Sequence, residues 1–148
     1  MTTKKKYHKN KLSYYELSLL SFLREDFPEH AGDVEFIRER ADHAAETYSQ
    51  AIRNGRSHIE AEELASDELF RGLAFSPYNT LVNILWNEFS KSVSEDDAQR
   101  VALQILPLCG EILAKYSFPD DFIGMPEYDL LYTELTGTIQ ILLEDGKL

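Results

Sequence analysis

Helix-start signals recur along this chain and constrain its fold more than any other feature of the sequence. Two S-x-x-E patterns have the form of a capping box, in which the serine and glutamate side chains satisfy each other's backbone N–H groups. At two further positions an N-cap residue directly precedes a run of periodic apolar residues. The boxes are Ser13/Glu16 and Ser57/Glu60, and the further caps are Asp33 and Ser76, which Pro77 follows.

Apolar residues after each of these signals recur every three or four positions, which is the spacing of one face of an α-helix. No run of useful length shows the alternation that is typical of a strand. We therefore predict an all-α fold, an irregular or orthogonal bundle of about six helices. The expected helices cover approximately residues 14–26, 34–54, 58–71, 77–89, 96–116 and 127–145.

Three residues carry more specific expectations. Trp86 lies in the most apolar of the predicted helices, so we expect this helix to be central and the indole to be largely buried. Pro107 lies inside the fifth predicted helix, where it predicts a kink or break near residues 104–106. Gly137 lies inside the last predicted helix and suggests a close helix crossing.

Charge divides the chain unevenly. The 148 residues include 26 Asp and Glu against 15 Lys and Arg, a formal charge of −11. Five lysines nevertheless fall within the first eleven residues (Lys4, Lys5, Lys6, Lys9 and Lys11). We predict a disordered lysine-rich arm at 1–11 and one helical domain at 12–148, with Leu12 and Leu17 placed as a hydrophobic staple around the first box. The arm is either a solubilising tail or a weak contact to nucleic-acid phosphates or an anionic membrane.

The cysteine content and the hydropathy limit the cellular location in which we expect the protein. Cys109 is the single cysteine, which excludes an internal disulfide and any multi-cysteine zinc or iron–sulfur site. It lies on an apolar helical stripe, so we expect a buried structural thiol. No apolar run approaches the length of about 18–20 residues that a membrane span needs. The expected location is a reducing cytoplasm.

Few residue patterns in the sequence indicate catalysis, metal binding or cofactor binding. Glu39, His43 and Glu46 share one predicted helix face, and His58 and Glu62 share another. Such residues are either solvated or one adventitious divalent site, and the Glu-x-x-His motif of di-iron bundles does not occur. No nucleophile elbow, phosphate loop or dinucleotide fingerprint occurs either. We therefore expect no enzyme activity, no catalytic residues, no metal and no cofactor.

Two groups of residues are candidates for an interaction surface. The acidic group is either a solvated helix face or a set of carboxylates placed like DNA phosphates. The aromatic group lies in and after the last connector, and is either core packing or an interface patch. The acidic group comprises Glu60, Glu62, Glu63, Asp67 and Glu68, and the aromatic group comprises Phe118, Phe122, Tyr128 and Tyr132.

Several long stretches resemble one known family. They are SYYELSLLSFLRE, FIRERADHAAETYSQAIRNG, IEAEELASDELFRGL, FSPYNTLVNILWNEF, LPLCGEILAKY and PEYDLLYTELTGTIQILLE, which together span nearly everything after the lysine arm. The family consists of small acidic proteins from Bacteroidetes, commonly carried on conjugative transposons and described only as a domain of unknown function. The resemblance implies an all-helical fold, a bacterial cytosolic setting and an association with mobile elements. It brings no assigned catalytic residue.

These observations favour a non-enzymatic helical module that binds another protein. The alternative is an acidic DNA mimic that inhibits a nucleic-acid enzyme, because mobile elements use such decoys. We expect no membrane association, and direct contact with nucleic acid only weakly through the lysine arm. Nothing in the sequence specifies an oligomeric state.

Overall fold

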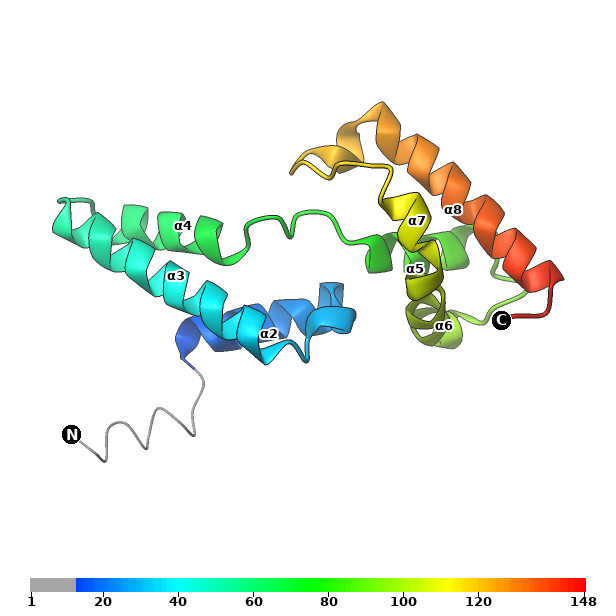
Figure 1. Cartoon of the computed structure of the whole chain (residues 1–148), viewed down its shortest axis with the longest axis horizontal. Coiled ribbons are helices and arrows are strands. Elements are labelled where there is room, and N and C mark those ends of the chain that lie inside the picture. The colour runs from blue at the N-terminus through cyan, green and yellow to red at the C-terminus, as the bar shows by residue number, and fades with distance from the viewer. Residues whose placement is uncertain (1–12) are drawn as a thin grey trace. The chain divides into compact units, whose positions relative to one another are not determined.

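The computed structural model describes residues 13–148, which form helices joined by turns (Figure 1). No strand occurs among these residues, and the predicted all-α class is confirmed. The lysine-rich arm and Leu12 of the expected staple lie outside the described residues. The α-helices are α2 (Tyr14–Asp26), α3 (Val34–Arg53), α4 (His58–Leu69), α5 (Pro77–Glu88), α6 (Ala98–Ile105), α7 (Gly110–Leu113) and α8 (Pro126–Glu144). Short 3-10 helices lie at η1 (Pro28–His30), η2 (Glu95–Asp97), η3 (Leu106–Cys109) and η4 (Phe122–Gly124).

The helices group into two compact units, Met1–Arg71 and Gly72–Leu148, called unit 1 and unit 2 below. Unit 1 contains helices α2 to α4, and unit 2 contains helices α5 to α8. The single domain expected at 12–148 stays a prediction. Within residues 13–148, no helix combines the length and the apolar character needed to cross a membrane.

Both predicted capping boxes form, and both lie in unit 1. The Ser13 side chain accepts a hydrogen bond from the Glu16 backbone N–H at 3.1 Å, and Ser57 accepts one from the Glu60 backbone N–H at the same distance. Asp33 caps α3 in the same way, with 3.2 Å between its Oδ1 and the Phe36 nitrogen. These caps explain why the helices of unit 1 begin where the sequence predicts.

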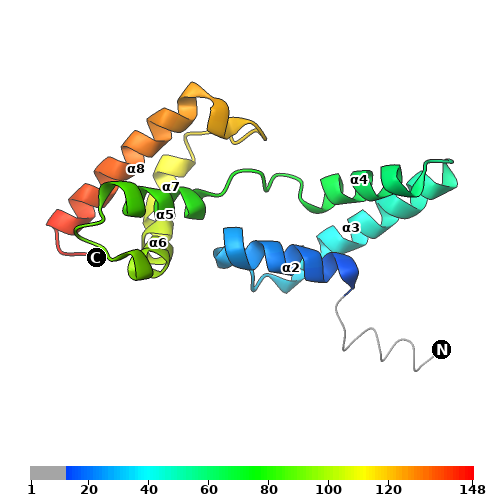
Figure 2. The same cartoon turned by 180° about the vertical axis from the view of Figure 1, so that it is seen from behind.

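Helices α3 and α4 run side by side in opposite directions, as Figures 1 and 2 both show. Gly55 closes the turn between them with a φ of +85°, a conformation that favours glycine. The facing surfaces carry small residues, because Ala44, Ala61 and Ala65 are all fully buried. Five of the seven buried residues of α3 and α4 are alanines, so small side chains make up most of their buried surface.

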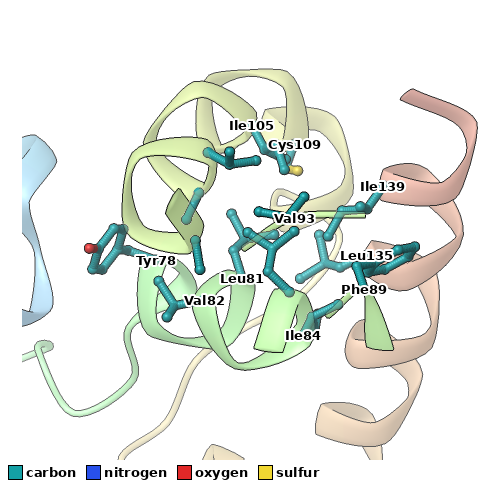
Figure 3. Close-up of a cluster of buried hydrophobic side chains, with 14 of the residues drawn as sticks. Tyr78, Leu81, Val82, Ile84, Phe89, Val93, Ile105, Cys109, Leu135 and Ile139 are labelled. Carbon is teal, nitrogen blue, oxygen red and sulfur yellow. The ribbon is translucent and has the colours of Figure 1, made fainter. Parts of the chain in front are cut away.

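Unit 2 has a core of larger side chains (Figure 3). Its centre is α5, where Leu81, Ile84 and Leu85 are fully buried, and it packs against α6 and α8. Helix α8 contributes the stripe of Leu131, Leu135 and Ile139, all with no exposed surface. The prediction that α5 is the core helix is confirmed.

The prediction that Trp86 is largely buried is wrong, because 43% of this residue is exposed. Trp86 follows Leu85 at the C-terminal end of α5, so one helical step of about 100° turns it away from the buried face. Its indole N–H instead donates to the backbone carbonyl of Glu95, at 3.3 Å. The apolar residues of α5 cover more of its circumference than the core can enclose.

The break predicted at Pro107 is confirmed. Helix α6 ends at Ile105, the 3-10 helix η3 follows at Leu106–Cys109, and the chain resumes as the four-residue α7. Proline lacks the N–H for an α-helical hydrogen bond and clashes with the preceding turn, which accounts for the interruption. The interruption of the helix begins at Leu106, at the end of the predicted interval of residues 104–106.

The close helix crossing predicted at Gly137 does not occur. A Cβ atom added there meets nothing within 4 Å, and the position is exposed. Gly137 lies two residues from both Leu135 and Ile139, which places it on the opposite face of α8 from the buried stripe.

Candidate functional site

The predicted acidic group lies on α4, where two of its members bind residues of neighbouring helices. Glu62 Oε1 accepts a hydrogen bond from the Tyr15 hydroxyl of α2 at 3.3 Å. Glu68 Oε1 lies 3.8 Å from His43 Nδ1 of α3 and 3.4 Å from the Arg71 guanidinium. Desolvation by burial, together with the charge of Glu62, raises the pKa of Tyr15 to about 12. These two carboxylates thus help to join α4 to the rest of unit 1.

The other three members, Glu60, Glu63 and Asp67, are exposed on the outer face of α4. Glu60 completes its capping box and also accepts from Arg56 at 3.3 Å. The hydrogen bond from the Ser57 backbone, together with those from the Ser57 and Arg56 side chains, lowers the pKa of Glu60. The five acids therefore do not present one uniform surface of free carboxylates.

The residues considered as metal ligands are dispersed. His58 Nδ1 pairs with the Tyr48 hydroxyl, whereas His43 faces Glu68. Glu46 accepts from Gln50 and Arg53 of its own helix. Glu39 and His43 do line one small cavity of about 220 Å³, together with Phe36, Arg40 and Arg71. In the described part of the chain, no three His, Cys, Asp or Glu residues are grouped for a metal ion.

The aromatic group packs into the core of unit 2. Phe122 is only 1% exposed, and its ring centroid lies 4.8 Å from that of Phe75 and 4.9 Å from that of Phe118. Tyr128 and Tyr132 are half-buried, 6.3 Å apart between centroids. The sequence gives no signal for Phe75, because its ring contacts are with residues far along the chain and not with its own helix. The Phe122 ring is not available to a partner in this conformation.

Polar contacts fasten the last connector to α8. Glu134 accepts from the Lys115 ammonium at 2.5 Å and from the Tyr116 hydroxyl at 2.6 Å. The hydrogen bond to Glu134 raises the pKa of Tyr116, and the hydrogen bonds from Lys115 and Tyr116 lower the pKa of Glu134. The predicted buried thiol is confirmed nearby, because Cys109 has no exposed surface and burial raises its pKa to about 11. Cys109 is therefore not activated as a nucleophile.

A groove lies beside Trp86 in unit 2. It encloses about 290 Å³ and is lined by Trp86, Ser90, Val93 and Glu95. The hydrogen bond from the indole N–H to the Glu95 carbonyl holds the ring against this turn. Sequence analysis missed the groove because Trp86 was assigned to the core. The only signal for it in the sequence is the short acidic segment that follows α5.

The comparisons with known proteins place the chain in a family. Residues 7–148 match the domain of unknown function DUF1896, and the chain belongs to this family. The resemblance found in the sequence is confirmed to this extent. A solved structure, that of protein PG0816 from Porphyromonas gingivalis, is 42% identical with a TM-score of 0.86. The match covers 99% of this chain and 97% of that one. No curated protein matches, so the function of the chain is not established by similarity.

Proposed function

We propose that this chain is a non-enzymatic module that binds another protein through unit 2. The observation that carries the proposal is the groove beside Trp86. Tryptophan is a large apolar side chain that is highly buried on average and enriched at the energetic centres of protein interfaces. Here 43% of Trp86 is exposed, beside a concave surface of about 290 Å³. A partner that covers this ring gains the apolar burial that the fold leaves unused.

The proposal extends to the origin and the cellular location of the protein. Similarity to a protein from Porphyromonas gingivalis supports a bacterial origin, and the family resemblance supports a cytoplasmic protein encoded on a mobile element. We propose no cofactor and no membrane contact. The test of the setting is the genomic neighbourhood of family members: genes for conjugative transfer beside most of them support it, and their general absence contradicts it.

The placement of the acidic group makes a DNA mimic the weaker alternative. A mimic needs carboxylates spaced like phosphates and free to meet a basic groove. Glu62 and Glu68 instead make hydrogen bonds or ion pairs to neighbouring helices, and Glu60 pairs with Arg56. A partner that dissociates at moderate salt and competes with duplex DNA would revive this alternative.

Site-specific photo-cross-linking in the native cell tests protein binding. A photoreactive residue replaces Ser90, which lines the groove, and in a matched control it replaces Ser49, an exposed serine of α3. We expect one protein to be captured from position 90 and not from position 49. The proposal fails if position 90 captures no protein above the level of the control.

A further inference from the structure

The groove beside Trp86 combines an aromatic wall with a free carboxylate. The Trp86 ring and Val93 provide the apolar side, and Ser90 and Glu95 provide the polar side. The backbone carbonyl of Glu95 accepts from the indole, so the polar edge of the ring is already satisfied. The exposed surface of the Trp86 indole and the Glu95 carboxylate are therefore available to a ligand.

The Glu95 carboxylate has no hydrogen bond or ion pair within residues 13–148. Asp97, two residues on, is paired with Arg100 at 3.5 Å, and Glu88 at the end of α5 accepts from the Tyr132 hydroxyl at 3.3 Å. Lys91 lies on the same turn but is not one of the residues that line the groove. Glu95 is the acidic residue among those that line the groove, and its carboxylate is left to a partner.

The residues of unit 2 around Glu95 also carry mainly negative charge. Unit 2 contains twelve Asp and Glu against four Lys and Arg, and Glu95 is followed directly by Asp96 and Asp97. Such a surface attracts cations and repels nucleic acid. A purely apolar occupant would desolvate Glu95 and Ser90 without compensating them, which is unfavourable.

We infer that the groove beside Trp86 binds a lysine or arginine side chain of a basic segment in the partner protein. A cation over the face of tryptophan is the strongest pairing of this kind, and an adjacent carboxylate adds a charge-assisted hydrogen bond. The volume of about 290 Å³ suits one long side chain rather than a larger ligand. This inference rests on the proposed function and names the chemistry of the partner.

The test uses the natural fluorescence of Trp86, which is the single tryptophan of the chain. The full chain is titrated with a short capped Gly-Ser peptide carrying two lysines, at near-physiological ionic strength. The control peptide carries ε-acetyl-lysine at both positions, which has nearly the same shape and no charge. We expect a saturable change in Trp86 emission with the lysine peptide and none with the acetylated peptide.

Paired variants separate the groove from the general negative charge. Glu95→Gln removes the carboxylate of the groove, and Glu111→Gln removes an equal charge at another exposed position of unit 2. We expect Glu95→Gln to weaken binding about ten-fold and Glu111→Gln to change it less than about two-fold. Trp86→Leu, followed by fluorescence polarisation of a labelled peptide, also loses binding, whereas Trp86→Phe keeps part of it. Circular dichroism verifies that each variant is folded.

Three results overturn the inference. If Glu111→Gln weakens binding as much as Glu95→Gln does, the peptide follows overall charge and not the groove. If the acetylated peptide binds as well as the charged one, the groove recognises an apolar chain. Capture of a protein from position 90, combined with no binding of the lysine peptide, leaves the proposed function standing and removes this inference alone.

Discussion

Unit 1 and unit 2 bury their apolar residues in different ways. Half of the buried apolar residues described in unit 1 are alanines (Ala41, Ala44, Ala51, Ala61 and Ala65). In unit 2 the buried set consists mainly of large aliphatic and aromatic side chains, such as Leu81, Ile84, Phe122 and Leu135. Because burial stabilises roughly in proportion to apolar area, each buried residue contributes more in unit 2. Unit 1 depends more on the close approach of its helices.

Polar contacts link separate segments in both units: in unit 2, Glu134 of α8 accepts from the Tyr116 hydroxyl and Glu88 of α5 accepts from the Tyr132 hydroxyl. In unit 1 they link different helices: Tyr15 binds Glu62, and the Arg40 guanidinium donates to the carbonyls of Leu69 and Arg71 at 3.1 and 2.7 Å. These carbonyls lie at and just beyond the C-terminal end of α4, where helical carbonyls lack partners. In unit 2, the turn around Trp86 and Glu95 keeps an exposed indole and a carboxylate without a partner among residues 13–148.

The largest expected effect is in the core of unit 2. Phe122→Ala removes a 1% exposed ring that contacts four other aromatic residues, so we expect it to lower the free energy of unfolding by roughly 3–5 kcal/mol. Urea unfolding followed by circular dichroism measures the loss. Leu130→Ala, at a position 61% exposed in the same unit, is the control and is expected to change stability by less than about 0.5 kcal/mol. Equal effects would contradict the core described here.

The alanine packing of unit 1 predicts that its stability is lowered by larger side chains, whereas that of unit 2 is lowered by smaller ones. Ala44 is fully buried on α3, so we expect the larger side chain of Ala44→Leu to clash with its neighbours and to cost roughly 1–3 kcal/mol. Ala45 is exposed on the next step of α3, and Ala45→Leu is expected to cost less than about 0.5 kcal/mol. The same urea experiment compares them. A neutral Ala44→Leu would show that unit 1 is loosely packed.

The serine caps predict a smaller difference. Ser57 accepts a hydrogen bond from the Glu60 N–H, so Ser57→Ala is expected to lower stability by about 1 kcal/mol. Ser94 precedes η2, and its side chain makes no cap hydrogen bond there, so Ser94→Ala is expected to be nearly neutral. Thermal unfolding of the two variants makes the comparison. A larger loss for Ser94→Ala would contradict the described start of η2.

The smallest effect concerns alkaline pH and unit 1. The pKa of Tyr15 is raised from 10.0 to about 12. A raised pKa means that its contribution to stability is complete below about pH 10 and is lost as the pH rises toward 12. We expect Tyr15→Phe to remove this part of the alkaline loss, and Tyr14→Phe, at a residue 71% exposed, to leave it unchanged. Identical alkaline profiles for Tyr15→Phe and the unsubstituted chain would show that the Tyr15–Glu62 contact does not contribute.

Much of the fold was predictable from the sequence, because helix boundaries depend on local chemistry. Ser13, Asp33 and Ser57 act within three residues of themselves, and each caps the helix that it predicts. Pro107 acts on the hydrogen bonds of its own turn, and its break was predicted for the same reason. Gly137 was misjudged because a close crossing depends on which face of α8 meets the core.

The candidate site was not predictable, because it depends on how far the core reaches. Trp86 and Leu85 are neighbours of similar apolar character, yet one is 43% exposed and the other is fully buried. Only the packed arrangement separates them, through the turn that brings Glu95 to the indole N–H. The sequence shows that acidic residues cluster between positions 60 and 68. It does not show that Tyr15 and His43, which contact two of them, lie on other helices packed against α4.

Trp86 is a half-exposed ring in a groove that Glu95 lines, within an acidic unit. Collisional quenching of its fluorescence tests this claim most directly, because the chain has no other tryptophan. We expect caesium, a cation, to quench Trp86 more strongly than iodide does when each is expressed relative to its quenching of free N-acetyltryptophanamide, and we expect Glu95→Gln to narrow this difference while Glu111→Gln does not. Emission that neither ion quenches, or stronger quenching by iodide on the same relative scale, would contradict it.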